Sequence, residues 1–339
     1  MEKVRVEDAV GMVLAHDLTK IVPGEFKGPA FKKGYIVQAG DIEELKSIGK
    51  NHLWVVALSE DQVHENEAAR RIGAAAGAGT VVAEPAEGKA NIQAGIRGLL
   101  KVNVDALLEL NRLNGIALAT LHDNVVVEAG QMVAAAKVIP LTMARADIER
   151  AERICAQNGP VIAVKPLYPL KCGIIVTGSE VYSGRIEDRF GAVLKAKIET
   201  YGGQFLAIRY APDDAGHIQG LILGLIGAGA ELILISGGMA VDADDVTPQA
   251  IREAAEEVIG YGAPVLPGAM CMVAYRDAVP LFGVPGCAMY TRTTVIDLLL
   301  PRMLARERLT GEDLARLGHG GLCRHCETCH FPVCSFGKR

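Results

Sequence analysis

The feature that most constrains the fold is an alternation of strand-like and helix-like segments between residues 166 and 310. Short apolar runs such as KCGIIV and ELILI have the length of buried strands, and the longer segments between them have helical character and end in glycines. Strands that are joined through helices form parallel sheets with helices on both faces. We therefore expect a three-layer α/β domain with a parallel sheet in this region.

Each expected strand ends in a polar or glycine-containing loop. In chain order these loops contain TGSEVYSGRIED, APDD, SGGMAVDADDVTP and VPG. Because the carboxyl ends of parallel strands lie along one edge of a sheet, loops at four strand ends predict a binding site at that edge. The third loop, SGGMAVDADDVTP, is the most acidic. As an alternative to a binding site, it could be a solvated loop without a ligand. We expect Thr247 to cap the helix that Pro248 begins.

The loops resemble motifs of the molybdopterin-binding domain shared by molybdopterin adenylyltransferases, molybdopterin molybdenumtransferases and gephyrin. Residues 177–180 resemble the T-G-x-E of the molybdenumtransferases, and residues 187–191 resemble the E-D-R-x-G of the adenylyltransferases. Residues 213–214 resemble an acidic pair present in both. Residues 236–248 resemble the adenylyltransferase motif in which two glycines precede D-V-T-P, and residues 285–286 resemble a late P-G turn.

The resemblance implies a domain that binds molybdopterin, a pterin dithiolene with a terminal phosphate, or its adenylated form. It implies a part in molybdenum cofactor biosynthesis, with molybdate as a further substrate. Glycine turns and helix N-termini would donate N–H groups to the phosphate, and aspartates would hold Mg²⁺ during adenylyl transfer or molybdenum insertion. The implied cofactor-binding residues are Thr177, Gly178, Ser179, Glu180, Ser236, Gly237, Gly238, Thr247, Pro285 and Gly286. The implied catalytic residues are Asp188, Asp213 and Asp245, with Asp213 and Asp245 as metal ligands.

The chain also departs from both enzyme patterns. Met239 and Ala240 replace the Thr-Gly of the adenylyltransferase loop, and Ala240 and Asp242 replace a Ser and a Gly of the molybdenumtransferase loop. Phe190 replaces the serine of E-D-R-S-G, and residues 266–270, LPGAM, lack the two lysines of the molybdenumtransferase run K-P-G-K-P. The retained acidic residues favour a molybdopterin molybdenumtransferase or adenylyltransferase. The replaced residues favour a non-catalytic molybdopterin carrier or a redox or metal sensor, and both interpretations stay open.

Half of the eight cysteines lie close together near residue 330, in the stretch GLCRHCETCHFPVC. Their C-x2-C-x2-C-x4-C spacing is too tight for paired zinc knuckles and is closer to an iron–sulfur cluster loop. Three interpretations remain open: an iron–sulfur cluster, zinc with His319, His325 or His330 as a substitute ligand, and redox-active thiols without metal. We expect a metal to order this tail. The expected ligands are Cys323, Cys326, Cys329 and Cys334.

The first half of the chain carries weaker signals. Residues 1–60 predict short strands around a helix, and VEDAVGMVLAHDLT resembles the opening of the molybdenumtransferases. Residues 61–165 predict helices and a mostly-β module that matches neither enzyme. We therefore expect a β-rich domain (1–60), a small α+β domain (61–165), the molybdopterin-binding α/β domain (166–310) and the Cys-rich tail (311–339).

Composition argues against two classes of partner. The formal net charge is −5 and no basic block is present, which argues against nucleic acid. The first ten residues lack the apolar core of a signal peptide. The most apolar tract, IQGLILGLIGAGAELILI, is rich in glycine and contains Glu231, which argues against a membrane span. We expect a cytoplasmic protein that forms a homo-oligomer, with a dimer favoured.

Overall fold

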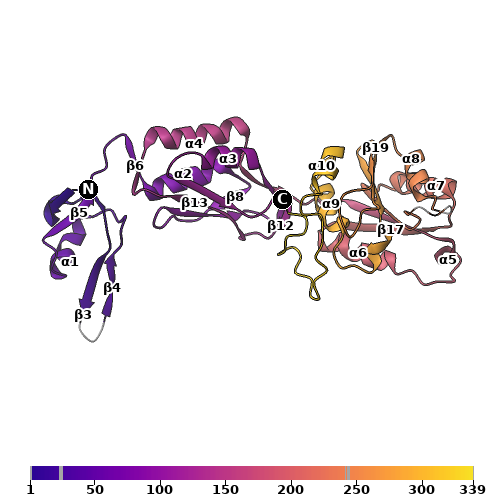
Figure 1. Cartoon of the computed structure of the whole chain (residues 1–339), viewed down its shortest axis with the longest axis horizontal. Helices are drawn as coiled ribbons and strands as arrows, with labels where there is room; N and C mark the ends of the chain where they lie inside the picture. Colours follow the sequence, from indigo (N-terminus) through magenta and orange to yellow (C-terminus); the bar gives the residue numbers. More distant parts are fainter. Residues whose placement is uncertain (1, 23–25, 241, 243–244, 339) are drawn as a thin grey trace. The chain divides into compact units, whose positions relative to one another are not determined.

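The chain divides into two compact units in a computed structural model that describes residues 2–22, 26–240, 242 and 245–338 (Figure 1). Unit 1 comprises Met1–Ile96, Leu100–Leu121 and Val127–Val164. Unit 2 comprises Arg97–Leu99, His122–Val126 and Lys165–Arg339. The four domains expected from the sequence divide the chain more finely than these units, and that division stays a prediction.

The beginning of unit 1 is a small β-rich module with its own hydrophobic core, which includes Leu14, Leu45 and Val55. Its three-stranded antiparallel sheet has the order β1-β5-β2, and a separate two-stranded sheet pairs β3 with β4. The elements are β1 (Glu2–Arg5), η1 (Val6–Asp8), β2 (Val13–Leu14), β3 (Leu18–Val22), β4 (Phe26–Phe31), η2 (Ala39–Asp41), α1 (Ile42–Ser47) and β5 (His52–Val56).

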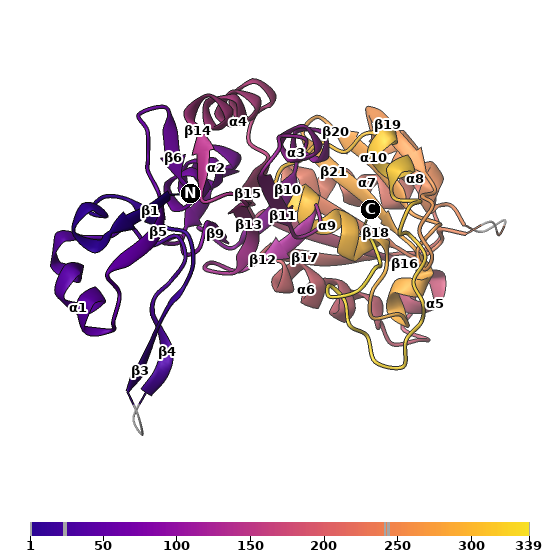
Figure 2. The ribbon, with the colours of Figure 1, turned by 60° about the vertical axis from the view of Figure 1, so that its left-hand side comes forward.

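The rest of unit 1 packs helices against a four-stranded antiparallel sheet, which Figure 2 shows through its central strands β13 and β9. The sheet consists of β8 (Thr80–Val82), β9 (Lys89–Ala94), β11 (Ile116–Thr120) and β13 (Met132–Val138). The helices are α2 (Glu65–Ala76), α3 (Val104–Asn111) and α4 (Arg145–Asn158). Strands β6 (Gln62–His64), β7 (Gly77–Ala78) and β14 (Thr142–Ala144) also lie in unit 1. Strands β10 (Gly98–Val102), β12 (Val125–Val127) and β15 (Ile162–Pro166) each include residues of both units.

Unit 2 is built on a six-stranded sheet with the order β17-β16-β18-β21-β20-β19. The parallel strands are β16 (Lys171–Thr177), β17 (Gln204–Ala211), β18 (Leu232–Ser236) and β21 (Val279–Val284). Strands β20 (Met272–Arg276) and β19 (Glu257–Tyr261) extend the sheet in antiparallel pairing. The expected parallel sheet is confirmed, and it carries an antiparallel edge that the sequence did not predict.

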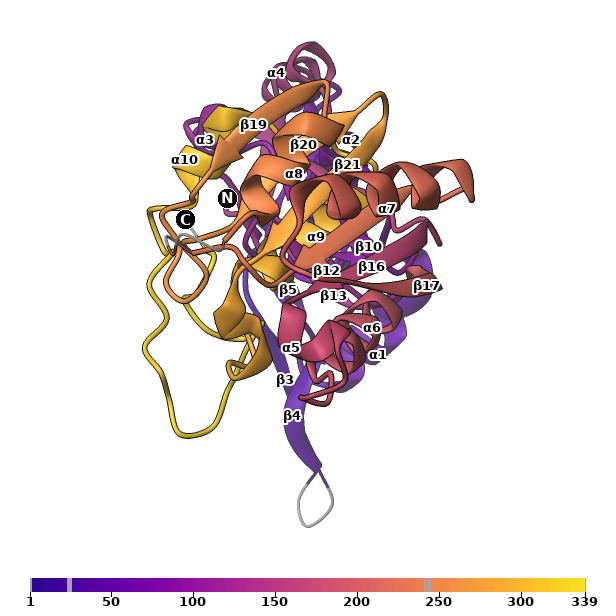
Figure 3. The ribbon, with the colours of Figure 1, turned by 90° about the vertical axis from the view of Figure 1, so that its right-hand side faces the viewer.

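Helices cover both faces of this sheet and complete the expected three layers. Alternate residues of a strand point to opposite faces, and accordingly Ile174 joins the core under α6 (Phe190–Thr200) and α9 (Val295–Leu304), whereas Ile175 joins the core under α7 (Ala215–Gly227) and α8 (Thr247–Ala254). Figure 3 shows α6 and α7 on opposite sides of β16 and β17. The shorter helices of the unit are α5 (Ser179–Tyr182), η3 (Gly286–Met289) and α10 (Gly311–Arg316).

The helix expected directly after Pro285 is shorter than the sequence indicated. The chain makes the single turn η3 and then leaves helical geometry, and α9 begins only at Val295. The reason is a capping box, in which the Thr294 side chain accepts from the helix backbone and Asp297 accepts from the backbone N–H of Thr294. Residues 290–293 are therefore a loop. Among the helices of the described ranges, none is both long and apolar enough to cross a membrane.

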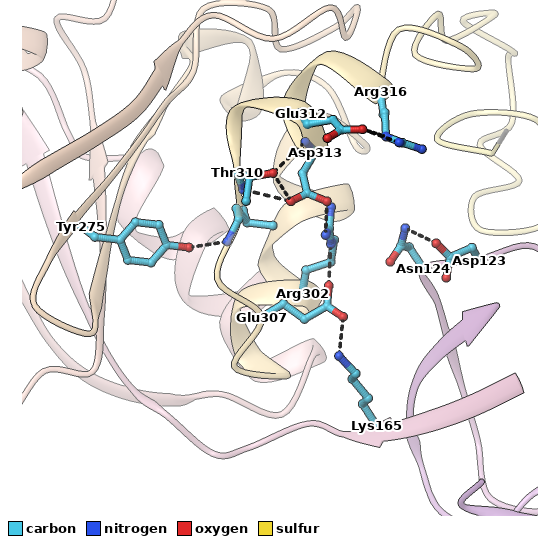
Figure 4. Close-up of polar contacts among 11 residues, drawn as sticks. Asp123, Asn124, Lys165, Tyr275, Arg302, Glu307, Thr310, Glu312, Asp313 and Arg316 are labelled. Carbon is cyan, nitrogen blue, oxygen red and sulfur yellow. Dashed lines mark hydrogen bonds and ion pairs between the residues drawn. The ribbon is translucent and has the colours of Figure 1, made fainter. Parts of the chain in front are cut away.

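A buried ion-pair network holds α10 on the end of α9 (Figure 4). The Arg302 guanidinium, 7% exposed, donates to Glu307 over 2.8 Å and to Asp313 over 2.6 Å, and Glu307 also pairs with Lys165 over 2.9 Å. Burial by itself would raise the pKa of Asp313, but hydrogen bonds from Arg302 and Thr310 outweigh it and lower that pKa to about 2. The Tyr275 hydroxyl accepts a hydrogen bond from the backbone N–H of Leu309, in the loop between α9 and α10.

Candidate functional site

The candidate site lies where the chain connections diverge in the sheet of unit 2. From β16 the chain passes to β17 on one side, and from β17 it passes to β18 on the other side of β16. Ligands of open α/β sheets bind at the carboxyl ends of the strands beside such a switch point. Here these ends are Thr177 of β16 and Ser236 of β18.

Three buried hydroxyl residues meet at this point. The Thr177 hydroxyl donates to the Ser236 carbonyl over 3.1 Å, and its oxygen lies 3.1 Å from the Thr247 hydroxyl, which therefore donates to it. Thr177 is 5% exposed, and the other two are fully buried. The expectation that Thr247 caps α8 is wrong, because Val246 occupies the capping position and Thr247 begins the helix. Its hydroxyl instead links α8 to β16.

Glycine is required where the strand ends approach each other. Gly237 has a φ of +95°, and a Cβ at this position would lie 2.4 Å from the Thr177 carbonyl oxygen. Gly238 has a φ of +52°, and its Cβ would lie 2.9 Å from the Thr247 hydroxyl oxygen. Any side chain at Gly237 would therefore push apart the ends of β16 and β18.

The Ser236 hydroxyl differs from those of Thr177 and Thr247, because it makes no hydrogen bond to any of the described residues. Its oxygen is buried and has no hydrogen-bond partner in the described part of the chain. A buried hydroxyl without a partner typically costs roughly 1–3 kcal/mol, and such groups are few in native proteins. The hydroxyl is therefore a candidate contact for a polar ligand atom.

Asp213 joins the loops that follow β16 and β17. Its Oδ2 accepts the backbone N–H of Ser179 over 2.9 Å, and its own N–H donates to the Ser179 hydroxyl over 3.3 Å. Asp214 has a different role, because it caps α7 by accepting the N–H of His217 over 2.6 Å. The sequence predicted the first two loops at one edge, and the structure brings them into direct contact.

Asp188 and Asp245 each shape their own loop. Asp188 accepts the N–H of Gly191 at the start of α6 and the hydroxyl proton of Tyr210 over 3.1 Å. Burial and the charge of Asp188 raise the pKa of Tyr210. Asp245 accepts the N–H of Asp242 over 3.1 Å in the acidic loop. Residues 241, 243 and 244 of that loop, Asp244 included, lie outside the described residues.

Tyr261 is a residue of this edge that the sequence did not indicate. It ends β19, and its hydroxyl donates to the carbonyl of Met239 over 2.8 Å and lies 3.2 Å from that of Ala240. Burial, followed by the charge of Asp245, raises the pKa of Tyr261. A lone tyrosine at the end of an unpredicted strand carries no sequence signal, so only the fold reveals it.

The acidic residues do not form a metal cage of protein ligands. In the described ranges, no three His, Cys, Asp or Glu side chains are grouped so that they could hold an ion. Mg²⁺ is usually bound by one or two carboxylates together with water and substrate phosphates. Asp213 and Asp245 fit Mg²⁺ only in that form, as partners of an anionic ligand. The turn at Pro285 and Gly286 follows β21 at the same edge.

The Cys-rich tail is attached to the rest of unit 2 by backbone hydrogen bonds and by one buried side chain. The N–H of Gly337 donates to the Gly320 carbonyl over 2.9 Å, so the two ends of the segment 320–337 meet, and Phe336 is buried in the core. Leu266 exchanges backbone hydrogen bonds of 2.8 Å with Gly321 and Cys323. The expectation that a metal orders this segment stays a prediction.

The four tail cysteines line one cavity of about 550 Å³, together with residues 290–293. Cys323 and Cys334 pack against the core, and Cys326 is exposed. The Cys329 sulfur lies 3.3 Å from the Thr293 hydroxyl, and hydrogen bonds from that hydroxyl and from the Phe331 backbone lower the pKa of Cys329. The thiols share one cavity but do not converge on a preformed metal site in the described residues.

Comparison with known protein families agrees with this geometry. Residues 173–305 match the family described as "Probable molybdopterin binding domain". This part of the chain belongs to the molybdopterin-binding domain family. Residues 3–57 match a family described as a domain of unknown function (DUF8806). The molybdopterin-binding domain contains every expected site residue except the four tail cysteines.

Curated relatives match the chain over a short stretch. CinA-like proteins are 35% identical over 81 residues in Mycolicibacterium vanbaalenii and 33% identical over 81 residues in Mycobacterium leprae. In both cases the match covers 24% of this chain and 19% of the relative. The chain therefore spans about a fifth of the length of these relatives.

Solved structures that resemble part of the chain include two MoaB proteins. The molybdopterin biosynthesis enzyme MoaB from Thermus thermophilus is 18% identical, with a TM-score of 0.36, over 41% of this chain and 98% of that protein. The tungsten cofactor synthesizing protein MoaB from Pyrococcus furiosus is also 18% identical, with a TM-score of 0.34, over 42% of this chain and 99% of that protein.

Proposed function

We propose that unit 2 binds molybdopterin, or its adenylated form, at the edge formed by the ends of β16, β17, β18 and β21, and so takes part in molybdenum cofactor biosynthesis. The observation that carries the proposal is the buried Ser236 hydroxyl without a partner, beside a turn that requires glycine. An unpaired buried hydroxyl destabilises the protein, and a ligand that forms a hydrogen bond with that hydroxyl removes the destabilisation. The match of residues 173–305 supplies the class of ligand.

The proposed contacts fall into two groups. Backbone N–H groups of the turn at Gly237 and Gly238 suit the oxygens of a phosphate, because small residues let the main chain approach an anion closely. Gly178 lies at the same edge, but its N–H already donates to the Ala211 carbonyl. Ser179, Glu180 and the Pro285-Gly286 turn border the same edge. The hydroxyls of Thr177 and Thr247 keep the two strand ends at their spacing, which positions Ser236.

Binding is the first part of the proposal, and turnover is the second. Asp188, Asp213 and Asp245 each bond to a loop N–H, which leaves part of their carboxylate capacity for Mg²⁺ with the phosphate of a ligand. This supports molybdenum insertion or adenylyl transfer. Residues 266–270 lack lysine, which supports the alternative, a non-catalytic carrier or sensor. A cytoplasmic homo-oligomer and an iron–sulfur or zinc centre in the tail belong to the same proposal.

The binding experiment compares Ser236→Ala with the wild type. Removal of an unsatisfied hydroxyl should leave unit 2 as stable as before or more stable, whereas loss of a ligand contact worth about 1 kcal/mol should weaken molybdopterin binding about fivefold. Binding is measured by anaerobic calorimetry, and bound pterin by its fluorescence after oxidation. Ser59→Ala, in an exposed loop of unit 1, is the matched control. Wild-type protein without affinity for molybdopterin, or equal affinity of the wild type and Ser236→Ala, would contradict the proposal.

A second experiment separates the enzyme from the carrier. Molybdenum insertion is assayed with adenylated molybdopterin and molybdate, for the wild type, Asp245→Ala and Ala269→Lys. A charge-assisted contact to an anion is worth roughly 1.5–3 kcal/mol, about 10- to 100-fold in affinity. We expect weak wild-type activity that Ala269→Lys raises and Asp245→Ala abolishes. Binding without activity in all three variants would establish the carrier.

A further inference from the structure

The tail places four thiols around one cavity beside the ligand edge of unit 2. Its wall includes Cys323, Cys326, Cys329 and Cys334, and residues 290–293 complete it. Thiolates are the ligands that iron–sulfur clusters and zinc prefer. A volume of about 550 Å³ leaves room for a centre of several atoms and for inward movement of the thiols. Phe336, which anchors the tail in the core, lines the same cavity.

The scaffold of this cavity is continuous with the proposed molybdopterin site. Residues 290–293 follow the turn at Pro285 and Gly286, directly after β21. On the other side, Cys323 is bonded through its N–H to Leu266, in the loop between β19 and β20. Because β19 runs antiparallel to β20, and β20 runs antiparallel to β21, the strands β19 and β21 end at the same edge. Tyr261, the last residue of β19, contacts the acidic loop of that edge.

We infer that the four thiolates hold one metal centre, an iron–sulfur cluster or zinc, and that this centre fixes the loops at 266–268 and 290–293 and thereby strengthens molybdopterin binding. The effect on binding rests on the proposed function. Each thiol releases its proton as it binds the metal. Cys329 then moves toward the metal, and the loop 290–293 moves with it because Thr293 contacts the Cys329 sulfur. The tail thus couples the metal supply to the affinity for the pterin.

The metal is tested first, on full-length protein prepared without oxygen. Iron, acid-labile sulfide and zinc are counted per chain for the wild type and for Cys326→Ser with Cys329→Ser. Even outer-shell partners of a metal are typically worth roughly 10- to 100-fold in affinity, so loss of two direct ligands should lower the affinity by more than that, and most of the metal should be lost. The matched control is Thr328→Ser with Val333→Ser, which changes the same segment but keeps all thiols.

Iron with sulfide, or about one zinc per chain, lost in the cysteine variant and kept in the control, supports the metal centre and shows which metal it contains. Wild-type protein without metal, with four tail thiols that are alkylated in the folded state, overturns it. So does a cysteine variant that retains the wild-type metal content.

The coupling is tested by hydrogen exchange of peptides that cover residues 286–294 and 262–270. We expect slower exchange in the metal-bound wild type than in the cysteine variant, and about tenfold weaker molybdopterin binding by that variant. Equal exchange in both proteins would overturn the coupling whether or not molybdopterin binds. If exchange differs but no protein binds molybdopterin, the proposed function fails and the claim of strengthened binding falls with it, while the metal centre and the loop fixation stand.

Discussion

Replacement of Gly237 by alanine tests whether the contact between the ends of β16 and β18 is as close as the structure indicates. Two costs are expected. A residue with a Cβ typically loses roughly 1–2 kcal/mol in a left-handed conformation. In addition, the new Cβ would lie 2.4 Å from the Thr177 carbonyl oxygen, far inside an ordinary contact, so a strand end must move. Overpacking of this kind costs about 1–3 kcal/mol. The total is about 2–5 kcal/mol.

Gly229→Ala separates the two costs. Gly229 follows α7 with a φ of +89°, but no atom lies within 4 Å of its Cβ position, so this variant carries the conformational cost alone. We expect Gly237→Ala to exceed Gly229→Ala by about 1–3 kcal/mol. A further consequence is that movement of the Thr177 carbonyl disturbs the hydroxyl pair with Thr247.

The assay is native-state hydrogen exchange of peptides from β16 and β18, followed as a function of urea. Exchange gives an opening free energy for each segment, so it does not require the two units to unfold together. Equal losses for Gly229→Ala and Gly237→Ala, within about 0.5 kcal/mol, would refute the reasoning. The Thr177 carbonyl would then not constrain residue 237.

Three further predictions concern buried polar groups of unit 2. Thr177→Val should lower the free energy of unfolding, measured by denaturation, by roughly 1–3 kcal/mol because it leaves the Thr247 hydroxyl without its acceptor. The double variant Thr177→Val with Thr247→Val should recover part of that loss, and strictly additive effects of the two substitutions would contradict the pairing. Arg302→Lys should lower the melting temperature because a lysine cannot bond to both carboxylates of the network. Arg70→Lys, at an exposed position of α2, should change the melting temperature little, and equal shifts for the two variants would argue against the network. The pKa of Asp313 is lowered to about 2 from about 3.9 in the unfolded chain, so the ionised carboxylate stabilises the fold fully above about pH 4, and this stabilisation is lost as pH falls toward 2. Asp313→Asn should remove this part of the pH dependence of stability, and an unchanged acid unfolding profile would exclude the role of Asp313.

The parallel part of the sheet was predictable because each strand is a short apolar run that ends in a polar loop. The antiparallel edge was not, since residues 257–276 contain glycines and prolines that interrupt any clear period, and their pairing depends on β21. Helix α4 was also missed. Its buried residues Ile148, Ala151 and Cys155 are spaced by three and four, a narrow stripe that a count of helical spacing would have detected.

The site was predictable at the level of loops but not of individual bonds. Strand ends place Thr177 and Ser236 at one edge, and that prediction follows from topology alone. The local sequence pattern predicted Thr247 as a helix cap, whereas its hydroxyl is hydrogen-bonded to Thr177, 70 residues away in the chain. Tyr261 reaches the acidic loop from a strand that the sequence did not indicate. Contacts between distant segments decide such roles, and no local pattern encodes them.

The contact between the two ends of the segment 320–337 has a consequence for the evolution of this protein. Because Gly320 and Gly337 are hydrogen-bonded to each other, the loop between them begins and ends at nearly the same point of the domain. Doubling the length of such a loop costs only about 0.6 kcal/mol in closure entropy. Insertions, deletions and new cysteine spacings can therefore arise there while the sheet keeps its geometry.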